Sequence, residues 1–328
     1  MIKSILANKT ALLAYLIVSI SLLIICLASP FWPDWQWLIP IKYALLFGPR
    51  WLLYVLLLPA LLAFFQRQTL HKGLALSLFL LTLGFNGLSV SAPQPLSAEQ
   101  GDIVIMSANL GGSVNVDRIP ELFEKYDIDV AVFQEAAKFN GKDLLPNIYQ
   151  DCAGSLCLFS RFPFTSIEHF GRKTFGGWGN FANQYEIAIG HKTITLFNIH
   201  LETPRPVIQS LLGLSIDIEE AQQVDDNRRL EASIIASAAQ QSENVVLLGD
   251  FNMPIDENIY QQYFSSYSNA LRDTNYWLQP TKRTKWHSVT IDHLLHSPQL
   301  ESIEAFSVDE LHGDHNQLIV TIAFAQSD

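Results

Sequence analysis

Polar residues that can bind a metal or move a proton follow several apolar, β-rich runs of this sequence. They are Asn109, Glu135, Asn198, His200, Asp250, Asn252, Asp292, Asp314 and His315. Carboxylate and amide oxygens are hard ligands that suit Mg²⁺ or Mn²⁺, and histidine can carry a proton or steady a negative charge. Such a set can support water attack on a phosphoester, which needs an in-line nucleophile and neutralised phosphoryl oxygens.

Each of these residues also has a simpler explanation when it is taken alone. Asp and Asn commonly cap turns and helices, and a carboxylate beside a strand is usually solvated. A single histidine is more often structural than catalytic. The elements that would bring the residues together therefore decide how the set is interpreted.

Short apolar runs predict the strands of an α/β domain. They cover residues 103–108, 130–133, 156–160, 185–189, 193–199, 245–248, 289–295 and 318–324. Helical patterns cover residues 116–126 and 219–241, and in the first of these Ile119, Leu122 and Phe123 fall on one face. Many strands with few helices predict packed sheets with helices outside them. Loops at the strand ends are where such folds build their sites.

Seven short motifs occur in order along this region. They are S-A-N-L (107–110), F-Q-E (133–135), S-R-F-P (160–163), N-I-H-L (198–201), G-D-F-N (249–252), I-D-H (291–293) and G-D-H-N (313–316). The series resembles the endonuclease/exonuclease/phosphatase superfamily of deoxyribonuclease-like, metal-dependent phosphoesterases over residues 102–324. The resemblance implies a four-layer α/β sandwich, with two packed β-sheets flanked by helices.

The resemblance also implies a metal and a base. Glu135 would hold Mg²⁺ or Mn²⁺ with assistance from Asn109. Asp250 would orient and deprotonate the attacking water, and Asn252 would bind the phosphoryl oxygen or the water.

Two histidines and two further aspartates complete the implied site. His315 would contact a non-bridging phosphoryl oxygen, and Asp314 would orient His315 or contribute to the metal region. His200 would bind the phosphate from the opposite side. Asp292 would hold one of the histidines, expected to be His200, in a useful tautomer.

Other conspicuous residues have ordinary interpretations at this stage. Arg228 and Arg229 lie on the longer predicted helix, where a solvated face or a structural salt bridge is favoured. The glycine-rich stretch at 175–180 contains Trp178, which could contact substrate but is more simply a packed loop residue.

The first hundred residues contain three long apolar runs. They are residues 11–28, 45–65 and 73–90. Because about 20 helical residues cross a bilayer core, the runs predict three transmembrane helices, although the first could instead be a cleaved signal peptide. We therefore divide the chain into a membrane segment (1–92), a linker (93–101) and a catalytic domain (102–328).

The distribution of basic residues predicts the orientation of this segment. Lys3 and Lys9 precede the first run, Arg67 and Lys72 lie between the second and third, and residues 73–117 contain no Lys or Arg. The positive-inside rule then predicts that the catalytic domain lies outside the cytoplasm. We expect a multi-pass protein of the bacterial inner (plasma) membrane, with a periplasmic catalytic domain. In that oxidising compartment Cys152 and Cys157 could form a disulfide, although two free buried thiols are equally consistent with the sequence.

Charge restricts the function. The chain has 21 Lys and Arg against 32 Asp and Glu, and residues 101–328 hold 15 and 30 of these. Such acidity argues against a protein that coats nucleic acid by charge alone. We expect a membrane-anchored, metal-dependent phosphoester hydrolase, acting as a phosphodiesterase on nucleic acid or phospholipid headgroups, with the lipid bilayer as its other partner. The alternative is a non-catalytic membrane-anchored binding module that retains the fold.

Overall fold

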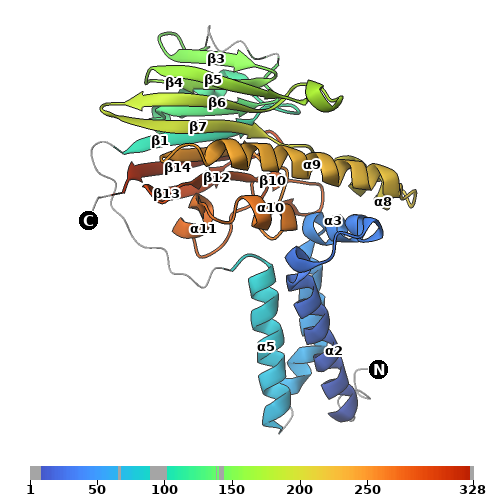
Figure 1. The fold of residues 1–328 in the computed structure, drawn as a ribbon. Coiled ribbons are helices and arrows are strands. Elements are labelled where there is room, and N and C mark those ends of the chain that lie inside the picture. Colours follow the sequence, from blue (N-terminus) through green and yellow to red (C-terminus); the bar gives the residue numbers. More distant parts are fainter. Residues whose placement is uncertain (1–8, 66–67, 89–101, 138, 140–143, 326–328) are drawn as a thin grey trace.

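The computed structural model describes residues 9–65, 68–88, 102–137, 139 and 144–325 (Figure 1). The predicted linker, residues 93–101, lies outside the described residues. The described part consists of a helical N-terminal segment and a two-sheet domain above it in Figure 1.

The first sheet of the domain has six strands in the order β13-β14-β1-β2-β4-β3. Its strands are β1 (Ile103–Asn109), β2 (Val130–Gln134), β3 (Tyr149–Ala153), β4 (Leu156–Ser160), β13 (Leu300–Val308) and β14 (Gln317–Phe324). The neighbours β1 and β2 run parallel and the other pairs run antiparallel.

The second sheet has the order β5-β6-β7-β8-β12-β9, and its parallel pair is β7 and β8. Its strands are β5 (Phe164–Gly171), β6 (Asn180–Ile189), β7 (Lys192–His200), β8 (Val245–Asp250), β9 (Ser268–Asn269) and β12 (Asp292–His296). A separate ribbon pairs β10 (Lys282–Arg283) with β11 (Ser288–Val289). The apolar run at 289–295 is therefore divided between two strands.

Apolar side chains from both sheets meet in one core, where Ile105 and Val132 of the first sheet share a cluster with Leu196, Leu248 and Leu294 of the second. Burying this continuous apolar surface between the sheets is the main force that holds them face to face. The sheets thus form the two inner layers that were predicted.

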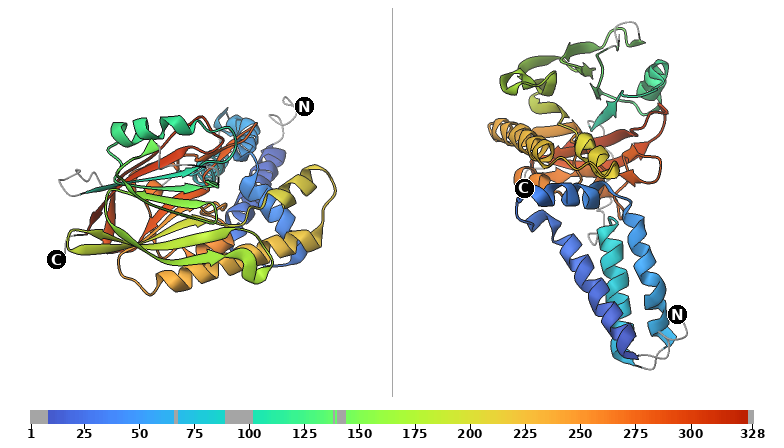
Figure 2. Two further views of the ribbon diagram at one scale, coloured as in Figure 1. Left: turned by 90° about the horizontal axis from the view of Figure 1, so that it is seen from above. Right: turned by 90° about the vertical axis from the view of Figure 1, so that its right-hand side faces the viewer.

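Helices cover the two outer faces (Figure 2, left). The helices of the domain are η5 (Val116–Arg118), α6 (Ile119–Lys125), η6 (Arg172–Phe175), α8 (Arg205–Leu212), α9 (Ile218–Ala239), α10 (Asn258–Tyr263) and α11 (Ala270–Thr274). Leu122 of α6 packs with Phe133 of the first sheet, and Ile235 of α9 packs with Leu247 of the second. The predicted α/β fold of two packed sheets flanked by helices is confirmed.

The N-terminal segment is a small bundle of helices below the domain in Figure 1. One of its helices lies crosswise at the top of the bundle, next to the domain. Its elements are α2 (Lys9–Leu27), η1 (Ser29–Phe31), η2 (Gln36–Leu38), α3 (Ile39–Phe47), η3 (Arg50–Leu56), α4 (Leu57–Ala60), η4 (Leu61–Phe65) and α5 (Thr69–Phe85). Leu16 of α2, Ala63 of η4 and Leu78 of α5 are buried in the centre of the bundle.

The prediction of three transmembrane helices is wrong. Within the described residues one helix, Lys9–Leu27, has the length and composition to cross a membrane, and the apolar helix Thr69–Phe85 has 17 residues. The middle run is bent by 83° between Gln36–Phe47 and Arg50–Phe64, and the bent pair counts at most as a second candidate. Gly48 and Pro49 stand at the bend, where proline lacks the N–H that would continue the helix. Part of the middle apolar run packs against the two-sheet domain instead of crossing a membrane.

Candidate active site

The two parallel strand pairs bring the predicted site residues to one edge of the double sheet. Asn109 ends β1, Glu135 directly follows β2, and His200 and Asp250 end the paired strands β7 and β8. Parallel neighbours have their carboxyl ends at the same edge, so each sheet contributes two adjacent polar side chains.

Asn109 connects the two sheets at this edge. Its Nδ2 donates to Glu135 Oε1 at 3.2 Å and to Asp250 Oδ2 at 3.0 Å. The second carboxylate oxygen of Asp250 accepts from the backbone N–H of Asn252 at 2.8 Å. Asp250 is buried, so these donors stabilise a carboxylate that is shielded from solvent.

The backbone at the site takes conformations that most residues avoid. Glu135 has φ 53° and Asn252 has φ 50°, both in the left-handed region. Gly249 has φ 142°, and a Cβ there would lie 2.1 Å from the carbonyl oxygen of Ile199. Only glycine fits this approach of β8 to β7, which explains the glycine of G-D-F-N.

His315 is paired with Asp292, which corrects the expectation that Asp292 holds His200. Both Asp292 oxygens lie 3.0 Å from His315 Nδ1. Asp292 begins β12 opposite Asp250 of β8, at the point where the chain just before β14 reaches the same edge. His315 Nε2 is left facing Asp250 Oδ2 at 3.6 Å.

The two histidines differ in charge. Burial alone would lower the pKa of His315, but the carboxylates of Asp292 and Asp250 outweigh it and raise this pKa to about 9. Burial lowers the pKa of His200, against the opposing charges of Asp250 and Glu135. At neutral pH the site therefore pairs an imidazolium at 315 with a neutral imidazole at 200.

His200 nevertheless lies with the same carboxylates. Its Nε2 is 3.8 Å from Glu135 Oε1 and 3.9 Å from Asp250 Oδ2. Its carbonyl oxygen accepts from Arg172 Nη2 at 2.7 Å, and Arg172 is in turn paired with the buried Glu231. No motif in the sequence pointed to Arg172, because its role depends on the turn that η6 makes beside β7.

Asp314 forms an ion pair with Lys282, whereas the His315 ring pairs with Asp292. The Asp314 side chain is 48% exposed. Asn252 is buried, and its Nδ2 donates to Leu201 O at 2.9 Å. Both residues are close to the site, since Asp314 precedes His315 and the N–H of Asn252 donates to Asp250.

The oxygens of Glu135 and Asn109 form a cradle that fits a hard divalent cation. A Cβ at Gly111 would come within 2.4 Å of Glu135 Oε2 and 3.1 Å of Asn109 Oδ1, so both oxygens lie close together beside this glycine, whose N–H donates to Asn109 Oδ1 at 2.8 Å. Buried ligand atoms of Asp250, Asp292 and His315 also lie within 4.8 Å of one another. Asp292 already pairs with His315, and Asp250 already accepts from Asn109 and Asn252, whereas the Glu135 side chain is 46% exposed. We therefore take Glu135, assisted by the Asn109 oxygen, as the residue that would hold the metal.

Sequence reasoning missed two polar contacts that support this edge. Gln134 Nε2 donates to Asn198 Oδ1 at 2.8 Å, which links the sheets beside Asn109, the register partner of Gln134 on β1. His293 is fully buried, with Nε2 2.9 Å from Met253 O and Nδ1 3.2 Å from Asn269 Nδ2. Polar residues inside otherwise apolar runs were the available signal.

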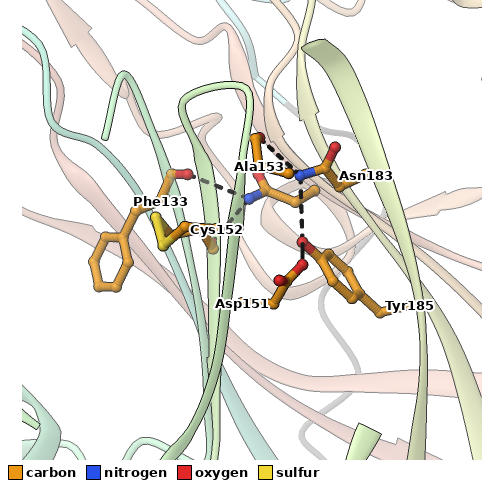
Figure 3. Close-up of a disulfide and its surroundings, with 8 residues drawn as sticks. Phe133, Asp151, Cys152, Ala153, Asn183 and Tyr185 are labelled. Carbon is orange, nitrogen blue, oxygen red and sulfur yellow. Dashed lines mark hydrogen bonds between the residues drawn. A yellow bond between two sulfur atoms is a disulfide. The ribbon is translucent and has the colours of Figure 1, made fainter. Parts of the chain in front are cut away.

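Cys152 and Cys157 form a disulfide across the β3–β4 hairpin (Figure 3). The hairpin tip reaches the site, since Ser155 O accepts from the N–H of Ala136, the residue after Glu135, at 2.9 Å. Asn183 Nδ2 donates to Ala153 O at 3.1 Å on the other side of the tip. Of the two interpretations left open by the sequence, the structure has the paired cysteines.

The glycine-rich loop after η6 is not packed as expected. Trp178 is 86% exposed, which contradicts the packed interpretation. The loop is held by backbone hydrogen bonds, among them Arg172 N to Gly179 O at 2.9 Å. An exposed indole on a backbone-fixed loop is available for contact with another molecule.

Comparison with known proteins gives the same family as the motifs. The model of the Endonuclease/Exonuclease/phosphatase family matches residues 106–315. Humanized D. rerio TDP2 superimposes with a TM-score of 0.54 at 15% identity, covering 68% of this chain and 100% of that one. A 3'-5' exonuclease (NExo) from Neisseria Meningitidis has a TM-score of 0.52 at 14% identity, with 68% and 100% covered. TDP2 from C. elegans has 0.52 at 15%, with 70% and 77% covered.

No curated protein matches the sequence. The solved structures are too distant in sequence to indicate more than the fold. The family match, in contrast, spans nearly all of the two-sheet domain and includes every residue of the edge described above. The chain therefore belongs to the Endonuclease/Exonuclease/phosphatase family, whose members are metal-dependent phosphoesterases.

Proposed function

We propose that this chain is a phosphodiesterase in which Asp250 activates water and His315 stabilises the phosphoryl group. The observation that carries the proposal is the approach of the buried Asp250 carboxylate to His315 Nε2 at 3.6 Å, with Asn109 and Glu135 beside it. A base, a cationic donor and a metal-binding oxygen pair are thus within reach of one phosphoryl group.

The residues have distinct tasks in this mechanism. Water attacks phosphorus as Asp250 accepts its proton, and the bond from phosphorus to the leaving ester oxygen breaks. The leaving oxygen takes a proton from solvent. His315 donates from Nε2 to a non-bridging oxygen, while Asp292 at 3.0 Å keeps the ring oriented and charged. A divalent cation held by Glu135 and Asn109 supplies further neutralisation of the phosphoryl charge when bound.

Asn252, His200 and Asp314 support the same step in the proposal. Asn252 fixes Asp250 through its N–H and remains the candidate for contact with the water or a phosphoryl oxygen. The neutral His200 can donate to the phosphate from the side opposite His315. Asp314, paired with Lys282, is better suited to shaping the rim than to orienting His315.

Two substrate classes fit a phosphodiesterase of this kind. A nucleic acid agrees with the solved structure of the 3' phosphatase NExo from Neisseria bound to a product DNA hairpin, which has a TM-score of 0.51 and 14% identity. A phospholipid headgroup agrees with the excess of acidic residues in 101–328 and with the apolar helices of the N-terminal segment. The non-catalytic binding module is less favoured, because every residue proposed to act in catalysis still has the side chain that the family motifs require.

The test is hydrolysis by the full-length chain in detergent micelles. Bis-p-nitrophenyl phosphate should be cleaved with Mg²⁺ or Mn²⁺ and not with EDTA. A panel of plasmid DNA, RNA, sphingomyelin and phosphatidyl lipids then identifies the substrate class. A folded protein that cleaves none of these with either metal would support the binding module instead.

Anchoring in the inner membrane with a periplasmic domain is also part of the proposal. The helix Lys9–Leu27, the lack of Lys and Arg from 73 to 117, and the Cys152–Cys157 disulfide support it. A C-terminal alkaline phosphatase fusion should be active and a green fluorescent protein fusion dark. The reverse pattern would place the domain in the cytoplasm.

A further inference from the structure

The helix α3 buries its apolar face against the catalytic domain rather than within the N-terminal bundle. Tyr43 and Leu46 of α3 lie in one cluster with Val207 of α8 and with Ala221 and Val224 of α9. Figure 2 (right) shows α3 lying crosswise between the bundle and the domain. A helix from the predicted membrane segment therefore completes the outer layer of the catalytic fold.

Beneath α3 lies a fully buried cation, Arg228 of α9. Its Nη2 donates to the carbonyl oxygen of Asn252 at 2.7 Å and to Glu257 Oε2 at 3.0 Å. Its Nε and Nη1 have no hydrogen-bond partner among the described residues. The guanidinium carbon instead lies 5.2 Å from the ring centre of Tyr43 and 6.0 Å from that of Phe47.

The rings of these two residues stabilise the buried charge of Arg228, in addition to its ion pair with Glu257. An aromatic face attracts a desolvated guanidinium, and a buried charge that loses a partner is strongly destabilised. Tyr43 is itself fixed, because its hydroxyl donates to Asp225 Oδ1 at 3.0 Å. Arg228 is thus held between α3 on one side and the carbonyl of Asn252 on the other.

Three consecutive residues that follow the G-D-F-N turn each have a polar partner in the N-terminal segment or on α9. Asp256 pairs with Arg50 at 2.8 Å, Glu257 pairs with Arg228, and Asn258 Nδ2 donates to Asp34 Oδ1 at 2.9 Å. Arg50 and Asp34 both belong to the N-terminal segment, on either side of α3. The N-terminal segment therefore contacts the chain that leaves β8 directly after Asp250 and Asn252.

We propose that α3 and its flanking residues position the Asp250–Asn252 turn, so that the N-terminal segment is a working part of the active site. Tyr43 and Arg228 are positioning residues in this arrangement and do not touch the substrate. The inference rests on the proposed catalytic role of Asp250. It implies that motion of the helical segment relative to the domain alters turnover.

The test compares two residues on opposite faces of α3 in the full-length chain in detergent. Tyr43 is fully buried in the cluster with α8 and α9, whereas Ile41 is 49% exposed and does not belong to that cluster. In Tyr43→Ala, kcat on bis-p-nitrophenyl phosphate should fall about 10- to 100-fold with KM changed less than about twofold, because a small displacement of a catalytic group has effects of this size. In Ile41→Ala both constants should stay at the wild-type values.

Amide hydrogen exchange supplies a readout that does not need activity. The peptide covering residues 250–258 should exchange faster in Tyr43→Ala and remain at the wild-type rate in Ile41→Ala. Tyr43→Phe keeps the ring over Arg228 and should restore most of kcat and protection. It also serves as the graded variant if Tyr43→Ala does not fold, together with Phe47→Leu, which removes only the more distant ring.

The outcomes separate this inference from the proposed function. Normal kcat and normal exchange in a folded Tyr43→Ala or Phe47→Leu protein would overturn the positioning role. A rise in KM alone would overturn it as well, because it would indicate altered substrate binding. If the wild-type chain hydrolyses nothing, the proposed function fails, and the exchange of residues 250–258 still decides whether α3 holds the turn.

Discussion

The strand-end site and the N-terminal helical segment both follow from apolar runs in the sequence, yet the runs specify them to different degrees. At the strand ends, short buried runs place Asp250 and Asn109 at one edge of the two sheets, where Asn109 Nδ2 lies 3.0 Å from Asp250 Oδ2. In the helical segment, equally apolar residues build one candidate span, a bent pair and a shorter helix. An apolar run indicates that side chains will be buried, but not whether lipid or protein will bury them.

The two regions also differ in what their side chains contribute. Asp250, Asp292 and His315 are buried charged groups, whose desolvation offsets much of their mutual attraction. Leu12, Leu16 and Leu78 in the bundle are fully buried apolar groups that contribute through packing. Substitutions at the strand ends should therefore affect turnover, whereas substitutions in the bundle core around α2 and α5, away from α3, should affect stability.

The largest expected effect is on turnover at the strand ends. Asp250→Asn keeps the shape of the side chain but removes the base, so kcat should fall by about 10²–10⁴ while KM and the melting temperature change little. Steady-state kinetics and thermal unfolding of the same preparation measure both. A folded variant with near-normal turnover would make Asp250 a structural turn residue and remove the contrast between the regions.

The opposite pattern is expected in the bundle. Leu16→Ala removes a fully buried side chain and should lower the free energy of unfolding by about 2–5 kcal/mol, with kcat unchanged at temperatures where the protein is folded. Denaturant unfolding of the full-length chain measures the loss. Ile17→Ala, at a residue that is 50% exposed on the same helix, is the matched control and should change little. Equal losses for both would mean that α2 is not packed as described.

Metal binding sharpens the comparison within the site. Glu135→Gln replaces a charged ligand by a neutral one, so the Mn²⁺ concentration for half-saturation should rise at least about 10- to 100-fold. Metal affinity falls by this factor even when only a residue that hydrogen-bonds to a ligand is changed. Titration of bound Mn²⁺ by electron paramagnetic resonance measures this without turnover. Glu202→Gln, which changes a carboxylate outside the cradle, should leave the affinity unaltered. Unchanged affinity in Glu135→Gln would move the metal to the Asp250, Asp292 and His315 group.

The smallest effect concerns His293, which supports the G-D-F-N turn from beneath. Burial lowers its pKa to about 4, so the folded state keeps it neutral while the unfolded chain, with a pKa near 6.5, takes up a proton first. Its stabilisation is complete above pH 6.5 and is lost as pH falls toward 4. The advantage of wild type over His293→Gln should shrink by about 2 kcal/mol between pH 7.5 and pH 5. Denaturant unfolding at the two pH values measures it, and a constant difference would mean that the ring is not buried neutral.

Much of the fold could be predicted because its central strands are buried on both faces. The runs at 103–108, 130–133, 156–160 and 245–248 correspond closely to β1, β2, β4 and β8. The edge strands β3 and β5 were not predicted, because nearly all of their residues are exposed or only partly buried and their sequences lack a continuous apolar run. The 3₁₀ start of the helix at 116–126 was likewise not distinguishable by periodicity.

For the site, the sequence by itself determined which residue types stand at the strand ends and hence the class of chemistry. Asp250, Asn109 and Glu135 meet because a strand fixes the position of the residue at its end. The tertiary structure decided the partners: Asp292 pairs with His315 and not His200, and Asp314 pairs with Lys282. It also decided that Tyr43 covers Arg228. These contacts join segments far apart in the chain, and their geometry depends on how layers pack, which no local pattern of residues encodes.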